Sequence, residues 1–131
     1  MRADPLVVSR LRTLWWVAGV VLVAATVYLT LEPASSIPSP GNFDKVEHFA
    51  TYVALMLWFS GLVSRRRHWL VAAALVLLGG CLELLQVKMQ LGRSGEWLDF
   101  AANAAGVGVG WFIAATFGDA WARRLEAWVG R

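Results

Sequence analysis

The sequence predicts an all-α, polytopic membrane protein: four transmembrane helices in a bundle, followed by a short interfacial amphipathic helix. Of its 131 residues, 58% are hydrophobic and only 16% are charged, which is far from the composition of a soluble domain. The charged residues fall in short blocks separated by long apolar runs, so hydropathy can be assessed run by run. Polar residues inside the later runs recur at helical spacing. The length suits a single domain over 1–131.

The first predicted span, 13–31, contains no charged residue and is long enough to cross the hydrocarbon core. Arg10 and Arg12 precede it, and Glu32 closes it. A cleaved signal peptide is the alternative, with Ala34 to Ser36 as its cleavage site. We favour a span because the run exceeds the ~7–15 apolar residues of a signal sequence.

The second and third spans are expected at 44–63 and 69–87, and the arginine-rich turn between them forms a hairpin. The second helix begins in polar sequence, where Asp44 and Glu47 have the spacing of a capping box. Capping is therefore the structural alternative to a functional role for these two acids. Before this helix, the proline- and serine-rich segment 33–42 is expected to form a loop.

The fourth span is expected at 99–117, and the interfacial helix at 119–129. In the last segment, apolar residues recur at helical spacing while Arg123 and Arg124 fall on other faces. This pattern is typical of a helix lying in the membrane interface. Four of the eight tryptophans occur at predicted span boundaries, as aromatic anchors do: Trp15, Trp16, Trp69 and Trp97.

Basic residues set the predicted orientation. Four spans place both termini on one side, and that side holds nine of the 12 lysines and arginines, namely Arg2, Arg10, Arg12, Arg65, Arg66, Arg67, Arg123, Arg124 and Arg131. The positive-inside rule therefore predicts that both termini are cytoplasmic. The net charge of +3 follows from this topology, so it does not indicate nucleic-acid binding. The single cysteine, Cys81, excludes an intramolecular disulfide.

Polar residues within the spans share one depth. Counting ~1.5 Å per residue from the cytoplasmic boundary places Tyr52, Glu83, Asn103 and His48 roughly 18, 21, 22 and 24 Å above it. All four positions lie in the outer third of a ~30 Å core. Each helix carries one polar stripe, and the stripes comprise Asp44, His48 and Tyr52; Glu83 and Gln86; and Asp99 and Asn103. The small-residue ridge of Ala102, Gly106 and Gly110 should turn the last stripe into the bundle.

Two of these residues are candidates for catalysis. A carboxylate at the depth of Glu83 must be paired, protonated or facing water, and His48 lies at the same level. Together they could act as general acid and base. For Asn103 and Gln86, interhelical hydrogen bonding is the alternative, and Tyr52 has the alternative of an interfacial aromatic. We expect no metal and no cofactor, because the other histidine, His68, lies at the opposite side.

These residues, in this order, resemble the VanZ-like family of small bacterial membrane proteins. The resemblance covers about 42–117 and rests on the Asp-Lys-x-x-His-Phe motif beginning at Asp44, followed by Tyr52, Glu83, Gln86, Arg93, Asp99, Asn103, Gly106 and Gly110. It implies a multi-helix membrane protein, in a family named for a protein associated with resistance to the glycopeptide teicoplanin. It also implies that the site includes Lys45 and Arg93 beside the stripe residues.

Three functions fit a polar pocket near the outer leaflet. The first is an enzyme acting on a lipid or lipid-linked envelope precursor, with Lys45 and Arg93 receiving a phosphate or carboxylate. The second is a module that binds a lipid or an antibiotic without chemistry. The third, a small transporter, is disfavoured because the inner halves of the helices are almost wholly apolar. The sequence leaves enzyme and binding module open, and it does not indicate an oligomeric state.

Overall fold

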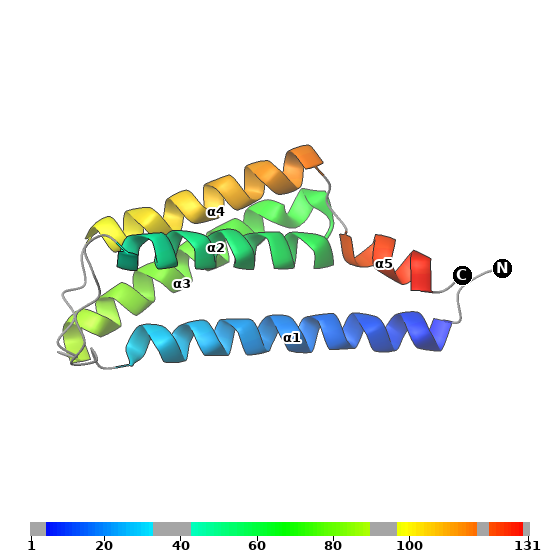
Figure 1. Cartoon of the computed structure of the whole chain (residues 1–131), viewed down its shortest axis with the longest axis horizontal. Helices are drawn as coiled ribbons and strands as arrows, with labels where there is room; N and C mark the ends of the chain where they lie inside the picture. Colours follow the sequence, from blue (N-terminus) through cyan, green and yellow to red (C-terminus); the bar gives the residue numbers. More distant parts are fainter. Residues whose placement is uncertain (1–4, 33–42, 90–96, 118–120, 130–131) are drawn as a thin grey trace.

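The computed structural model describes residues 5–32, 43–89, 97–117 and 121–129 of the chain. The described part is all-helical, which confirms the predicted class, and its elements are α1 (Pro5–Leu31), α2 (Phe43–Leu62), the 3₁₀ turn η1 (Arg65–Arg67), α3 (His68–Met89), α4 (Trp97–Phe117) and α5 (Trp121–Val129). The four long helices run alongside one another, and α5 lies near the N-terminal end of α1 (Figure 1).

Three of the described helical segments are long and apolar enough to cross a membrane: Val8–Leu31, Arg65–Met89 and Trp97–Phe117. The helix α2 is not among them, although it matches the second predicted span in position. Its first two turns carry Asp44, Lys45, Glu47 and His48, which lower its hydropathy. The composition of the helices thus supports a membrane protein with three spans, and a fourth span depends on where these polar turns lie.

The helix boundaries differ most from prediction in α1, which begins at Pro5 rather than near Thr13. Proline is favourable in a first helical turn, because its missing N–H has no partner there in any case. Arg10 and Arg12 therefore lie within the helix. Hydropathy marks where a helix enters the apolar region, and it cannot detect an extension into polar surroundings. The bounds of α2, α3 and α4 lie within two residues of the predicted spans.

The most extensive helix contact joins α2 to α4. Gly106 faces the backbone carbonyl of Phe49, so that a side chain there would meet main chain. A Cβ at Gly110 would lie 2.8 Å from the Met56 Cβ and 3.0 Å from the Val53 carbonyl oxygen. The predicted small-residue ridge therefore packs against α2, and its glycines allow the two backbones to approach closely.

The bundle has a small buried core and a largely apolar exterior. The core is formed by Tyr52, Leu55, Met56, Ala72, Leu75 and Val107. Large apolar side chains lie on the outside of three helices, and examples are Val20, Leu77 and Phe112. Such a surface is unfavourable in water but is expected where lipid surrounds the helices.

We call the end of the bundle that holds Arg12, Arg67 and Arg123 the arginine end. There α5 is attached by Trp121. The centroid of its indole ring lies 5.2 Å from that of Trp15 and 5.1 Å from that of Trp58. The Trp121 Nε1 donates a hydrogen bond of 3.1 Å to the Leu57 carbonyl. Tryptophan thus fastens α5 to α1 and α2.

The other large apolar side chains of α5 are exposed. Leu125, Trp128 and Val129 are exposed, whereas Ala122 and Glu126 are buried. The sequence predicts one apolar face for Trp121, Leu125, Trp128 and Val129, and of these four only Trp121 packs inward. The exposed three remain available for the predicted contact with the membrane interface.

Candidate functional site

The candidate site is built on the first three turns of α2, at the opposite end, which we call the Asp44 end. Asp44, His48 and Tyr52 follow one another every four residues, so they lie on one face of the helix. Exposure falls along this face: the Asp44 side chain is 38% exposed, while His48 and Tyr52 are 9% and 2% exposed. The stripe therefore leads from the surface into the bundle.

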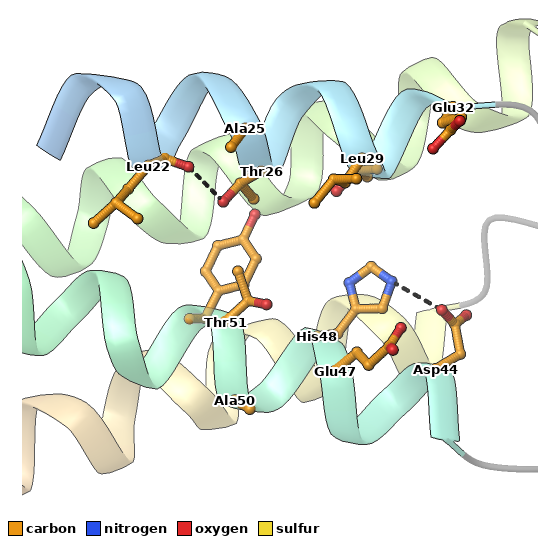
Figure 2. Close-up of a pocket in the computed structure, with 12 residues that line it drawn as sticks. Leu22, Ala25, Thr26, Leu29, Glu32, Asp44, Glu47, His48, Ala50 and Thr51 are labelled. Atoms are coloured by element: carbon orange, nitrogen blue, oxygen red, sulfur yellow. Dashed lines mark hydrogen bonds and ion pairs between the residues drawn. The ribbon is translucent and has the colours of Figure 1, made fainter. Parts of the chain in front are cut away.

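Neighbouring side chains orient the His48 ring. Its Nδ1 lies 3.0 Å from the Asn103 Oδ1, and because an amide oxygen only accepts, Nδ1 is the ring nitrogen that donates. The other nitrogen, Nε2, lies 3.7 Å from the Asp44 Oδ1. A dashed line marks this pair in Figure 2. When the ring is neutral, Nε2 is an acceptor that can take a proton; when the ring is protonated, it forms an ion pair with Asp44.

A second charge pair lies beside this histidine. Lys45 Nζ is 3.6 Å from the Oδ1 of Asp99, which is buried at the start of α4. One ligating atom each from Asp44, His48 and Asp99 lie within 4.8 Å of one another, close enough to hold a cation. The Lys45 ammonium already supplies a positive charge beside the Asp99 carboxylate. His68 is remote from this group, because its Nε2 lies 3.1 Å from the Ser60 carbonyl oxygen near the arginine end.

Glu83 lies deeper, on α3. One turn before it, Gly79 packs under the site: a Cβ there would lie 3.1 Å from the Asn103 Nδ2 and 3.2 Å from the Tyr52 hydroxyl. Glu83 follows on the same face of the helix and is 8% exposed. The structure thus gathers Tyr52, Asn103 and the Glu83 face of α3 behind His48.

Gln86 makes a different contact. Its Nε2 donates a hydrogen bond of 2.6 Å to the carbonyl oxygen of Thr30 in α1. This bond ties α3 to the end of α1, the interhelical role that was the alternative for this residue. Arg93, the remaining predicted site residue, lies outside the described residues.

A pocket of about 620 Å³ opens between α1 and α2 at the Asp44 end. Figure 2 shows Glu32, Asp44, Glu47 and His48 toward one end of it, and Leu22 and Ala25 further along α1. The described residues that line it are Leu22, Ala25, Thr26, Leu29, Thr30, Glu32, Asp44, Glu47, His48, Ala50, Thr51 and Tyr52. One end of the pocket is therefore acidic, and the side formed by α1 is mainly apolar.

Sequence reasoning predicted only part of this lining. Asp44, His48 and Tyr52 line the pocket, whereas Lys45, Glu83, Gln86, Asp99 and Asn103 lie beside or behind it. The contribution of α1 was missed. The available signal was the four-residue spacing of Thr26 and Thr30, but the Thr26 hydroxyl bonds the Leu22 carbonyl of its own helix, as isolated threonines in spans often do.

Comparison of the chain with protein-family models, with curated proteins and with solved structures found no match. The fold and the pocket geometry are therefore the basis for assigning a function.

Proposed function

We propose that this chain is a four-span protein of the bacterial cytoplasmic membrane that binds the headgroup of an amphiphile in the pocket between α1 and α2. The observation that carries the proposal is the division of this pocket into an acidic end and an apolar side. An amphiphile divides in the same way, with its headgroup at the surface and its chains along the helices. Small-molecule sites likewise combine apolar walls with a few placed polar groups.

The four-span topology rests on α2. Its 20 residues give a length of ~30 Å, which matches the hydrocarbon core. Helices on either side of it are apolar enough to span, and α2 lies among them (Figure 1). The arginine distribution then supports cytoplasmic termini and a pocket toward the outer leaflet.

Charge complementarity favours an amphiphile that carries an amine. The lining includes three carboxylates, Glu32, Asp44 and Glu47, and none of its described residues is a lysine or arginine. Lys45 is placed beside Asp99 rather than in the pocket lining. A zwitterionic phospholipid with an ammonium group fits this lining better than a phospholipid with only negative charge.

Lipid binding to the purified protein tests this proposal. Native mass spectrometry with phosphatidylethanolamine and phosphatidylglycerol should show preferential retention of the amine lipid. Asp44→Asn with Glu47→Gln should weaken that retention about tenfold or more, as expected when two charge-assisted contacts are lost. Lys88→Gln is the control, because this exposed residue at the same end does not line the pocket. Equal retention of both lipids by the wild type and the double variant would contradict the proposal.

A second candidate is an enzyme acting on the bound lipid or on a lipid-linked envelope precursor. It is favoured by His48, whose Nδ1 is oriented by Asn103 while Nε2 faces Asp44 in the pocket, as a general base requires. Glu83 would then be the buried acid. Chemical change of the lipid that His48→Ala and Glu83→Gln each abolish would support catalysis. Recovery of unmodified lipid after prolonged incubation would leave a binding module.

Membership of the VanZ-like family is part of the proposal, and the motif residues from Asp44 to Asn103 are what support it. A glycopeptide is accordingly a candidate occupant of the same pocket. Teicoplanin should then displace phosphatidylethanolamine from the wild type in native mass spectra. The Asp44→Asn, Glu47→Gln variant should show no bound teicoplanin. A small transporter remains the least favoured reading.

A further inference from the structure

A second pocket lies at the arginine end, away from the proposed amphiphile site. It has a volume of about 370 Å³ and is lined by Arg12, Trp16, Leu62, Val63, Ser64, Arg67 and Arg123. Its three arginines come from three different elements: α1, η1 and α5. The fold thus brings together cations that are far apart in the sequence.

The charge of this pocket has one sign. None of the described residues that line it is acidic, and guanidinium groups stay protonated under all ordinary conditions. Three like charges around one cavity repel each other, and a bound anion would remove that repulsion. A phosphate group is the best match, since guanidinium donors pair with its oxygens in bidentate fashion.

The arginines at this end do not all have the same role. Arg65 donates a hydrogen bond of 3.0 Å to the Ala115 carbonyl oxygen near the end of α4, so it stabilises the bundle. Arg12, Arg67 and Arg123 are exposed and line the pocket. Arg66 and Arg124 are their exposed neighbours, and neither lines it. The chain therefore supplies lining and non-lining arginines side by side.

The position of the pocket indicates where the phosphate comes from. Arg12 immediately precedes the apolar stretch 13–31, and Leu14 and Val17 are exposed beside it. Trp16, which lines the pocket, is 41% exposed. Arginine next to exposed tryptophan and apolar residues is typical of the level at which lipid headgroups lie, and basic pockets between helices there bind anionic lipids.

We propose that the pocket formed by Arg12, Arg67 and Arg123 binds the phosphate of an anionic phospholipid in the leaflet at the arginine end. This site is separate from the amphiphile pocket, which favours an amine and lies at the Asp44 end. Either site can exist without the other. The anionic lipid would join α1, η1 and α5 through a single headgroup.

Titration of the purified full-length chain with phosphatidylglycerol, in a phosphatidylcholine background, tests the site. Arg12→Gln, Arg67→Gln and Arg123→Gln should each weaken binding about fivefold, as expected for the loss of one arginine near a phosphate. Arg66→Gln and Arg124→Gln are the matched controls and should bind like the wild type. Equal losses in all five variants would show a diffuse charge effect and would overturn the proposal, as would wild-type affinity in the three lining variants.

Glycerol phosphate distinguishes a lipid from a soluble phosphate. We expect it to displace phosphatidylglycerol at least a hundredfold less effectively than the lipid displaces itself, because it lacks the acyl chains that bury apolar surface. Comparable affinity would assign the pocket to a soluble phosphate and reject the lipid. Since the three arginines belong to three elements, misfolding of one variant, detected by thermal unfolding, leaves two others to decide the result.

Discussion

His48 depends on one hydrogen bond for its orientation. Asn103, which supplies the acceptor, is only 1% exposed and lies 3.0 Å from the ring Nδ1. Asn103→Ala would leave the buried ring N–H without this partner and should lower the free energy of unfolding by about 1–3 kcal/mol. Denaturant unfolding in detergent measures the change. Asn103→Asp keeps an acceptor oxygen and should recover part of the loss, whereas equal unfolding of wild type and Asn103→Ala would refute the role of this bond.

At the scale of residues, the sequence predicted those contacts that carry a periodic signal. Asp44, His48 and Tyr52 could be placed on one face by their spacing, and Asn103 at their depth by counting. The partner of Gln86 could not be predicted, because it is the main-chain carbonyl of Thr30, and every residue has one. Glu32 was missed as a pocket residue because it lies just beyond the predicted span 13–31, so no pattern of polar residues within a span marked it.

At the scale of elements, the glycines of α4 give a matched pair of substitutions. A methyl group at Gly106 would meet the Phe49 carbonyl and would lie 3.1 Å from the Tyr52 Cβ. Gly106→Ala should therefore push α2 from α4 and destabilise the bundle by about 1–3 kcal/mol, the usual cost of overpacking. Gly108 has open space around it, so Gly108→Ala should be neutral or stabilising by up to about 1 kcal/mol. Thermal unfolding of both variants checks this, and the reverse order of stability would contradict the packing.

The attachment of α5 can be tested through its tryptophans. Trp121 lies against Trp15, Trp58 and the backbone of Gly61, whereas Trp128 is 69% exposed. Trp121→Ala should release α5, because it removes a hydrogen bond worth about 1 kcal/mol and the ring contacts as well. Amide hydrogen exchange in α5 should then rise at least tenfold. Trp128→Ala should leave exchange unchanged, and similar exchange in both variants would show that α5 is held in another way.

The sequence predicted which segments form helices, but it did not predict how α5 packs against the bundle. Apolar runs predict the bounds of α2, α3 and α4 to within two residues, since hydropathy is a local property of the chain. The inward turn of Trp121 depends on Trp15 and Trp58, which are distant in the sequence, and eight tryptophans offer many equivalent pairings. The early start of α1 at Pro5 was missed because helix and membrane span are different properties.

At the scale of the whole molecule, topology distinguishes four spans from three. If α2 spans, both chain termini lie on the same side, which we propose is the cytoplasmic one; if only the three apolar segments span, the termini lie on opposite sides. Replacing Cys81 by alanine gives a cysteine-free chain in which single cysteines can be labelled from either side. Cysteines placed at Ser9 and at Ala127 should be labelled from the cytoplasm alone. Labelling of the two from opposite sides would exclude α2 as a span.

The molecule separates its charges between its two ends. Counting basic residues predicted the arginine end, and depth counting predicted a polar region at the other. Neither count could reveal that each end is hollowed, because a pocket depends on how helices diverge and on which side chains fail to fill the gap. The acidic character of the Asp44 pocket also emerged only when the structure placed Lys45 beside Asp99.

The central claim, that an amphiphile occupies the pocket between α1 and α2, is tested most directly by filling that pocket. Ala25 and the adjacent Ala24 are both exposed on α1, and of the two only Ala25 lines the pocket. Retention of phosphatidylethanolamine, measured by native mass spectrometry, should fall at least tenfold in Ala25→Trp and stay at the wild-type level in Ala24→Trp. Wild-type retention in Ala25→Trp, with the indole in place and the bundle folded, would contradict the account.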